Sequence, residues 1–240
     1  MSLAISEPEE VTILIDEFIG QQNNIDLIKV AVESAHMRNQ SVPHMLFSGP
    51  RGSGKWTLAN IVAKMCSTSV IVVSCEKIKS VSELGTILNG VPYESVLIFK
   101  NMDRLKKDLV DILVQAMDDF SIDIVIGKGV SAEEIRLPIP NFTIIAVKDE
   151  EFALPYKLIR RFPIQLQFKP YLLNELIQIG SMYSAEIGAQ INEEGLEFLS
   201  YHASGSQKKL KNLIKRAWDF AIVTNGIIDK SSAELAVGSM

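Results

Sequence analysis

Two kinds of hydrophobic pattern follow one another along the chain, and the change falls near residue 170. Before it, short runs that are apolar throughout alternate with stretches in which apolar residues recur every three or four positions. The runs predict strands and the periodic stretches predict helices. The expected strands are 44–48, 70–74, 96–99 and 142–147, and the expected helices are 22–39, 58–65 and 105–117. Because fully apolar strands are typical of sheets covered on both faces, this part predicts an α/β fold with a parallel sheet flanked by helices.

Two further segments complete the predicted architecture. Alternating apolar and polar residues at 122–126 and 134–137 flank Gly127-Lys128-Gly129, which predicts an inserted β-hairpin. Beyond Lys169-Pro170 only helical periodicity is found, at 171–188, 192–203 and 206–224. We therefore predict an α/β domain at 1–168 and a small all-helical lid domain at 169–240.

The candidate chemistry begins where the first apolar run ends, in the sequence G-P-R-G-S-G-K-W-T. A strand precedes it and a helix follows, as the phosphate-binding loop G-x-x-x-x-G-K-S/T requires. Its glycines let backbone N–H groups surround a phosphate, but the Ser or Thr that should bind Mg²⁺ after the lysine is replaced by tryptophan. The residues expected at a nucleotide are Gly49, Pro50, Arg51, Gly52, Ser53, Gly54, Lys55, Trp56 and Thr57.

Composition and charge add few constraints. The formal net charge of −5 gives no general signal for nucleic-acid binding. A basic cluster at 208–216 is interpreted as a solvated helix face, with a DNA surface as the alternative. The two cysteines, Cys66 and Cys75, predict buried reduced thiols. With no basic N-terminal region and no apolar run of membrane-spanning length, the sequence predicts a cytoplasmic protein with no membrane contact.

Several segments in order resemble RuvB, the AAA+ motor family of Holliday-junction branch migration. They are D-E-F-I-G-Q from Asp16, the glycine loop, A-M-D-D-F-S-I-D-I-V-I-G-K-G from Ala116, P-N-F-T-I-I from Pro140, and S-G-S-Q-K-K-L-K-N-L-I-K-R-A-W-D-F-A from Ser204. The resemblance implies an AAA+ P-loop NTPase core with the family's hairpin, followed by a helical lid. Family members continue into a winged-helix DNA-binding domain, which this sequence is expected to lack.

The resemblance also implies roles for individual residues. Nucleotide contacts are expected at Phe18, Ile19, Tyr171 and Lys208, in addition to the loop. Arginines acting in trans on a neighbouring subunit are expected at Arg160 and Arg161, although the family's first arginine is replaced by Ile159; pairing with surface carboxylates is the alternative. The hairpin residues Ile124, Ile126, Val130 and Ile135 are expected to contact a partner protein.

The departures from the family fall on the catalytic positions. The Asp-Glu pair that holds Mg²⁺ and activates water is Lys100-Asn101 here, the sensor neighbourhood carries Lys148, and the lid's Pro-Arg pair is Gln207-Lys208. Asp103 lies nearby and is expected to be solvated. No intact catalytic residue and no metal site are therefore expected.

Two hypotheses about function follow. The first is a non-hydrolysing RuvB-like subunit or partner-binding module of DNA recombination or repair. It would join a RuvA-like or AAA+ partner in a homo- or hetero-oligomer and reach DNA only indirectly. The second is an active branch-migration helicase with a relocated metal site at Thr57 and Asn101. ATP or ADP could bind without Mg²⁺ if Lys55, Lys100, Lys148 and Lys208 converge; if Lys100 instead pairs with Asp149 or another carboxylate, no nucleotide is expected.

Overall fold

The computed structural model describes residues 4–8, 13–66, 69–126, 133–149, 153–224 and 226–239. Its contacts divide the chain into two compact units. Unit 1 comprises Met1–Ile15, Asn23–Ser48 and Trp56–Gln167, and unit 2 comprises Asp16–Gln22, Gly49–Lys55 and Phe168–Met240. One break between the units lies beside the expected boundary at 168/169, but unit 2 also takes the glycine loop and the segment before the first helix. The division into domains 1–168 and 169–240 stays a prediction.

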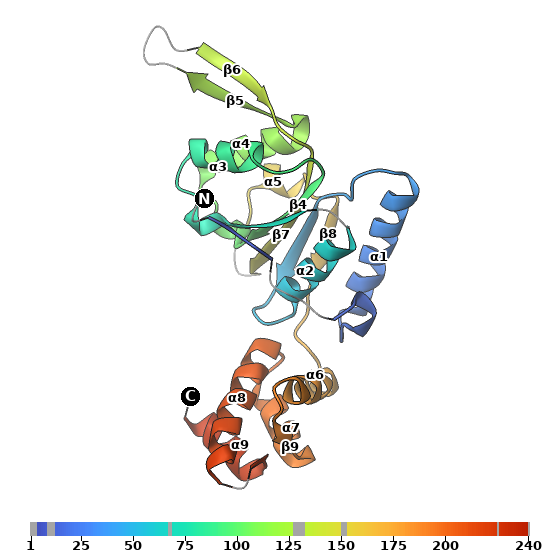
Figure 1. Cartoon of the computed structure of the whole chain (residues 1–240), viewed down its shortest axis with the longest axis vertical. Helices are drawn as coiled ribbons and strands as arrows, with labels where there is room; N and C mark the ends of the chain where they lie inside the picture. The colour runs from blue at the N-terminus through green and yellow to red at the C-terminus, as the bar shows by residue number, and fades with distance from the viewer. Residues whose placement is uncertain are drawn as a thin grey trace. The chain divides into compact units, whose positions relative to one another are not determined.

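A six-stranded sheet forms the centre of unit 1, in the order β1-β3-β4-β7-β2-β8 (Figure 1). The strands are β1 (Ile5–Ser6), β2 (Met45–Gly49), β3 (Val70–Ser74), β4 (Ser95–Lys100), β7 (Phe142–Asp149) and β8 (Ile164–Gln167). β1 pairs antiparallel with β3, whereas the pairs β3–β4, β4–β7 and β2–β8 are parallel. The four predicted strands and their parallel arrangement are confirmed, and the short edge strands β1 and β8 are additions.

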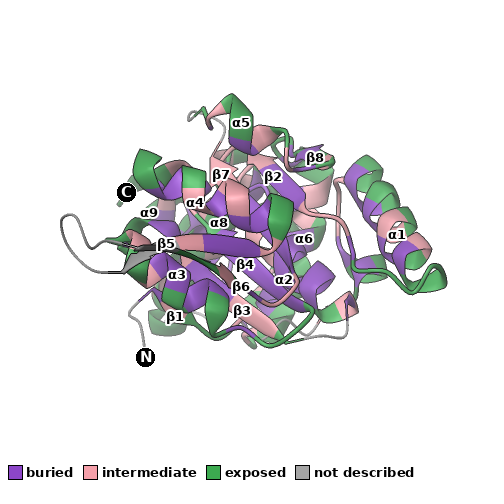
Figure 2. Ribbon diagram, turned by 90° about the horizontal axis from the view of Figure 1, so that it is seen from above, coloured by how far each residue is buried: buried purple, intermediate pink, exposed green. Residues whose placement is uncertain are grey.

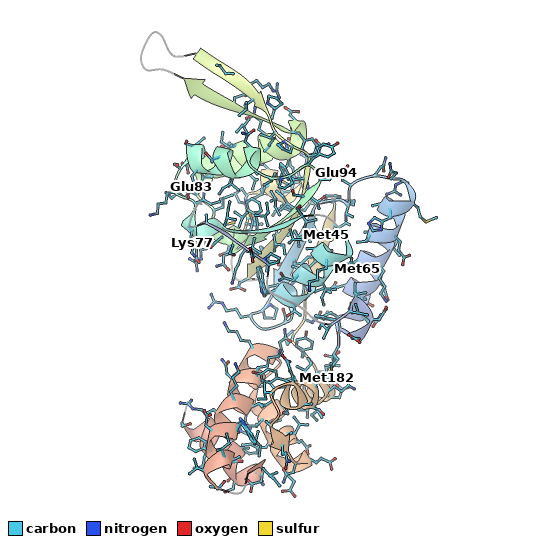
Figure 3. The ribbon with its side chains drawn as sticks, in the orientation of Figure 1. Met45, Met65, Lys77, Glu83, Glu94 and Met182 are labelled. Carbon is cyan, nitrogen blue, oxygen red and sulfur yellow. The ribbon has the colours of Figure 1, made fainter. Side chains whose placement is uncertain are left out.

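Helices cover the sheet of unit 1. They are α1 (Gln22–Met37), α2 (Lys55–Met65), α3 (Val81–Asn89), α4 (Lys107–Asp119) and α5 (Tyr156–Ile159), with single 3₁₀ turns at Ile15–Glu17, Cys75–Lys77 and Met102–Arg104. Leu97 and Phe99 of β4 pack with α3 and α4 in one cluster, and Val96 and Ile98, on the other face of the strand, are also buried (Figure 2). Met45 of β2 lies in the same interior (Figure 3). Burial on both faces explains why these strands read as continuous apolar runs.

Both cysteines are free and buried, as predicted from the composition. Burial raises the pKa of the Cys66 thiol to about 11 and raises that of Cys75 further. Neither thiol is therefore a nucleophile at neutral pH.

The described part of unit 2 contains four helices around their own core: α6 (Leu173–Glu186), α7 (Glu193–His202), α8 (Gln207–Val223) and α9 (Lys230–Gly238). The three predicted helices are confirmed, and α9 is an addition. α7 begins where the sequence predicts, since the Asn192 side chain accepts a hydrogen bond of 2.8 Å from Gly195 N–H. A two-residue parallel pair, β9 (Gln190–Ile191) with β10 (Ile227–Ile228), is the one strand element of this segment among the described residues.

The predicted hairpin is present in unit 1. β5 (Ser121–Ile126) and β6 (Glu133–Pro138) pair antiparallel, with Ile122 opposite Leu137 and Ile124 opposite Ile135. Figure 1 shows the two strands extending away from the end of α4. The predicted turn at Gly127-Lys128-Gly129 and the partner residue Val130 lie outside the described residues.

Candidate functional site

The glycine loop between β2 and α2 is packed closely by residues that the resemblance assigns to the nucleotide. Gly54 has φ +90°, a conformation that favours glycine, and a Cβ there would lie 2.3 Å from the Tyr171 hydroxyl oxygen and 2.8 Å from Phe18 Cζ. Phe18 and Tyr171 are both buried. Unit 2 thus brings together Phe18, Gly54 and Tyr171, and only glycine fits between the two rings.

The start of α8 lies against the other side of this loop. Gln207 N–H donates a 3.0 Å hydrogen bond to the carbonyl of Gly52. A Cβ on Gly52, whose φ is +81°, would lie 2.0 Å from Ser206 Oγ and 3.4 Å from Lys208 Cβ. Lys208 therefore lies beside the loop, its contact with a nucleotide stays a prediction, and Ser206 is a neighbour that the sequence does not reveal.

Gln21 is a second residue that sequence reasoning missed. Its side-chain amide donates to the Lys169 carbonyl at 2.7 Å and to the Ser53 carbonyl at 3.4 Å. Its amide oxygen also accepts from Lys169 N–H at 3.2 Å. Gln21 therefore ties the loop to the segment that enters α6. The only signal in the sequence is its place at the end of D-E-F-I-G-Q.

The lysine of the loop is already engaged by the loop itself. Lys55 is 5% exposed, and its Nζ donates to the carbonyls of Gly49 at 2.6 Å and Pro50 at 2.7 Å. The Ser53 hydroxyl also donates to the Pro50 carbonyl, at 2.8 Å. A phosphate would have to compete with these carbonyls for the ammonium group.

The other predicted nucleotide residues differ in how far they are buried. Ile19 packs on the core of unit 2, Pro50 and Thr57 are half-buried, and Arg51 is exposed.

The position that should bind Mg²⁺ contacts the residue that ends β4. In unit 1 the Lys100 ammonium lies 4.7 Å from the centroid of the Trp56 ring, a cation–π contact. Trp56 Nε1 is buried and has no hydrogen-bond partner among the described residues. Lys100 forms no ion pair with any carboxylate in the described part of the chain, so the expected alternative of a Lys100–Asp149 pair is wrong.

The residues at this position do not fit Mg²⁺. P-loop proteins hold the ion with a hydroxyl after the loop lysine and a carboxylate at the end of a neighbouring strand. Here those groups are an indole, which has no oxygen, and an ammonium, which repels a divalent cation. Asn101, with φ +56°, begins a 3₁₀ turn and carries an amide in place of a carboxylate. The described residues contain no group of three or more His, Cys, Asp or Glu side chains that could hold a metal.

Asp103 and Lys148 are two further charged residues of unit 1 for which the sequence gives an expectation. The Asp103 side chain is only 5% exposed and lies 3.2 Å from Arg104 Nε, so the prediction that it is solvated is wrong. Lys148, near the end of β7, donates to the Asp149 carbonyl at 3.0 Å. Lys100 and Lys148 belong to unit 1, and Lys55 and Lys208 belong to unit 2; their convergence stays a prediction.

Of the two arginines expected to act in trans, one is held by its own chain. Arg161 forms a bidentate pair with Asp118, with distances of 3.0 Å and 2.6 Å, and donates to the Lys157 carbonyl at 2.7 Å. The hydrogen bonds from Arg161 keep the pKa of Asp118 below its usual range. Arg160 is exposed, and its guanidinium lies 5.8 Å from the Tyr156 ring. Arg160 is the more accessible candidate, since no carboxylate in the described part of the chain pairs with it, and the trans role of either residue stays a prediction.

His44 lines a cavity of about 330 Å³ beside this pair, together with Met117 and Arg160. Its Nδ1 accepts a 3.0 Å hydrogen bond from Ile144 N–H, and its ring stacks on Phe142 with centroids 6.0 Å apart. Burial lowers the pKa of His44 to about 4, although the Asp118 charge opposes the shift. The imidazole is therefore neutral in the folded protein at pH 7.

We expect His44 to make the fold sensitive to acid. In the unfolded chain its pKa returns to about 6.5, so between that value and about 4 the unfolded state binds more protons. The contribution of neutral His44 to the free energy of unfolding is fully present above about pH 6.5 and is lost as the pH falls towards 4, by roughly 3 kcal/mol. Urea unfolding of the wild type and His44→Gln at about pH 7 and about pH 5 checks this. An equally steep loss in His44→Gln would contradict it.

The hairpin is anchored at its base and exposed further out. On one face Arg136 Nε donates to Ser121 Oγ at 2.8 Å and its guanidinium pairs with Asp119. On the other face Ile122 is 2% exposed within the core, whereas Ile135, two residues further from the base, is 42% exposed. Ile124 and Ile126 lie on β5, but their side chains are outside the described set.

Together, the parallel sheet, the glycine loop at the end of β2, the inserted hairpin and the helical segment define a P-loop protein of the AAA+ class. The sequence matches the family described as the Holliday junction DNA helicase RuvB P-loop domain over residues 12–168. The chain belongs to this RuvB family.

Similar proteins and solved structures indicate the same family. The chain is 34% identical over 219 residues to the Holliday junction branch migration complex subunit RuvB of Kosmotoga olearia, covering 90% of this chain and 64% of that protein. The Fusobacterium nucleatum subunit is also 34% identical, with coverages of 92% and 67%. The structure matches the Thermotoga maritima RuvB Holliday junction branch migration motor with a TM-score of 0.82 and 26% identity, covering 94% of this chain and 71% of that one. This chain therefore spans about two thirds of the length of these relatives.

Proposed function

We propose that this chain is a non-hydrolysing RuvB-like subunit, a partner-binding module in DNA recombination or repair. The observation that carries the proposal is the contact of Lys100 with Trp56 at 4.7 Å. It places a positive charge and an apolar ring at the two positions that hold Mg²⁺ in active P-loop enzymes. Lys100 is exposed, and even in a water-like environment like charges about 4 Å apart repel by about 1 kcal/mol per pair of unit charges, which opposes a divalent cation.

The loss of a general base supports the same proposal. An amide at Asn101 cannot accept the proton of an attacking water, and the loss of general-base catalysis costs at least about 10²-fold in rate. The Asp103 side chain is 5% exposed, lies 3.2 Å from Arg104 Nε and is a poor substitute.

The proposed role is to assemble with other proteins. The relatives' name, branch migration complex subunit, describes proteins that act within a complex. In this chain the exposed Ile135 on an anchored hairpin offers an apolar contact for a RuvA-like or AAA+ partner. DNA would be reached through that partner, and the oligomer would form in the cytoplasm. None of the helices among the described residues has the length and hydropathy of a membrane span.

The glycine loop supports nucleotide binding as part of this role. Its glycine geometry is intact and Lys55 is present, so ATP or ADP could be held without hydrolysis. The second candidate function, an ATP-dependent Holliday-junction helicase, is favoured by the same loop and by the family match at 12–168. It would need Thr57 and Asn101 to form a relocated metal site.

Mixing the chain with an active RuvB-family relative tests the proposal. We expect the chain to co-elute with the relative in size-exclusion chromatography and to change its ATPase rate without adding turnover. Asn101→Gly, which keeps the left-handed backbone, should act as the wild type because Asn101 supplies no base. If Asn101→Gly instead removes an ATPase activity of the chain itself, the helicase interpretation is favoured. Failure to co-elute with the relative or with a RuvA-like protein would contradict the subunit role.

A further inference from the structure

The side chains of Trp56 and Lys100 contact each other directly, whereas the residues at these positions in P-loop NTPases are joined by a bound metal ion. In P-loop NTPases the hydroxyl after the loop lysine and the carboxylate at the strand end both bind the same Mg²⁺. In this chain Trp56 follows Lys55 in the first turn of α2, and Lys100 ends β4. Their side chains lie 4.7 Å apart, from ammonium to ring centroid. The ammonium therefore stands between the two elements that a Mg²⁺ ion would otherwise connect.

No carboxylate among the described residues neutralises the charge of this ammonium. Asn101 is uncharged, Asp103 is paired with Arg104 at 3.2 Å, and no described carboxylate forms an ion pair with Lys100. On the neighbouring strand β7, Val147 lies opposite Lys100 and is followed by Lys148. The ammonium lies over the Trp56 ring, and the buried Nε1–H of that ring is a donor without a described partner. These groups are suited to an oxyanion and not to a metal.

We propose that the Lys100 ammonium, held on Trp56, is a built-in cation that binds phosphate oxygens of a nucleoside di- or triphosphate free of Mg²⁺. The inference rests on the proposed nucleotide binding and names the preferred form of the ligand. Chelation by Mg²⁺ removes two negative charges from the polyphosphate and presents a divalent cation to Lys100. Mg²⁺ therefore acts as an antagonist of binding at this site.

The chain offers its own optical probe for this proposal. It contains two tryptophans, Trp56 and Trp218, so Trp218→Phe leaves Trp56 as the only source of indole emission. Titrations with ADP and with ATP, in EDTA and in excess Mg²⁺, should change this emission as Lys100 shifts towards the phosphates. We expect apparent affinity to be at least about threefold weaker with Mg²⁺ than in EDTA.

Matched substitutions separate the contact from general charge effects. Lys100→Gln should weaken binding in EDTA by about tenfold and abolish the discrimination against Mg²⁺. Lys211→Gln removes a lysine that lies 4.6 Å from the ring of Tyr183 in unit 2, and it should change neither quantity. In calorimetric titrations, Trp56→Phe keeps an aromatic ring under the ammonium and should retain the discrimination, whereas Trp56→Leu should lose it. Melting curves of each variant show that it is folded.

Tighter binding with Mg²⁺, or no binding of either nucleotide in either condition, would overturn the inference. If Mg²⁺ weakened binding equally in the wild type and in Lys100→Gln, the inference would be overturned as well, since the effect of Mg²⁺ would then not depend on Lys100. Co-elution with a RuvB-family relative is measured separately. Retained co-elution with failed nucleotide titrations would remove this inference alone, and lost co-elution would contradict the proposed subunit role.

Discussion

Wild-type protein should release no phosphate from ATP above the background given by Lys55→Ala. The physical reason is the combined loss of the metal ligand, the metal-shell carboxylate and the general base, at Trp56, Lys100 and Asn101. Steady-state phosphate release with excess Mg²⁺ measures this. A turnover of about one per second that disappears in Lys55→Ala would show that a working site exists.

Restoring the three family residues should recover functions in a fixed order. Trp56→Thr, Lys100→Asp and Asn101→Glu together should first recover Mg²⁺-dependent nucleotide binding, with a gain of at least about tenfold, or about 1.4 kcal/mol, on adding the metal. Turnover should remain low because it also needs an arginine supplied in trans. Thr57→Val in the wild type is the control for a relocated metal site and should have no effect. Hydrolysis by the triple variant as a monomer would contradict a trans role for Arg160 and Arg161.

The second large effect is expected at the hairpin. Ile135→Asp should abolish binding to a RuvA-like or AAA+ partner, because burying an unpaired carboxylate costs several kcal/mol, or at least about 10²-fold in affinity. Its melting temperature should change little, since Ile135 is 42% exposed. Leu27→Asp is a matched control, because Leu27 is an exposed apolar residue on α1, at 57%. Pull-down and thermal melting on both variants decide the question.

The reverse pattern would assign the hairpin another role. Lost stability with retained partner binding in Ile135→Asp would show that this part of the hairpin belongs to the core. Arg136→Ala separates the base from the exposed region, because it removes the bonds to Ser121 and Asp119 and leaves Ile135 in place. It should weaken partner binding less than Ile135→Asp.

Patterns that are carried by one segment alone could be predicted from the sequence. The apolar runs of β2, β3, β4 and β7, the alternation of β5 and β6, and the glycine loop are all local, and the structure confirms each of them. The two-residue strands β1, β9 and β10 depend on partners elsewhere in the chain, and so short a strand leaves no periodic signal.

The contacts of the site were harder to anticipate, because they join distant segments. The sequence identifies Trp56 and Lys100 as departures from the family, but it does not predict that they touch each other at 4.7 Å. It gives Gln21 no role, although that side chain binds the Lys169 carbonyl at 2.7 Å. Asp103 is polar and follows a strand, which predicts exposure to solvent, yet it is enclosed beside Arg104. Which polar residue is buried depends on tertiary packing.

The Trp56–Lys100 contact also bears on how such a site could change over evolutionary time. Lys100→Asp alone would place a carboxylate against the negative face of an indole, and Trp56→Thr alone would leave the ammonium without its ring. Each single substitution therefore gives a less favourable contact than either the Trp56–Lys100 pair or the family's pair of hydroxyl and carboxylate. The effect of each substitution thus depends on the residue at the other position, which makes a stepwise return unfavourable. Where both are present, a metal site at these two positions could be formed only through an unfavourable intermediate or by changing both residues together.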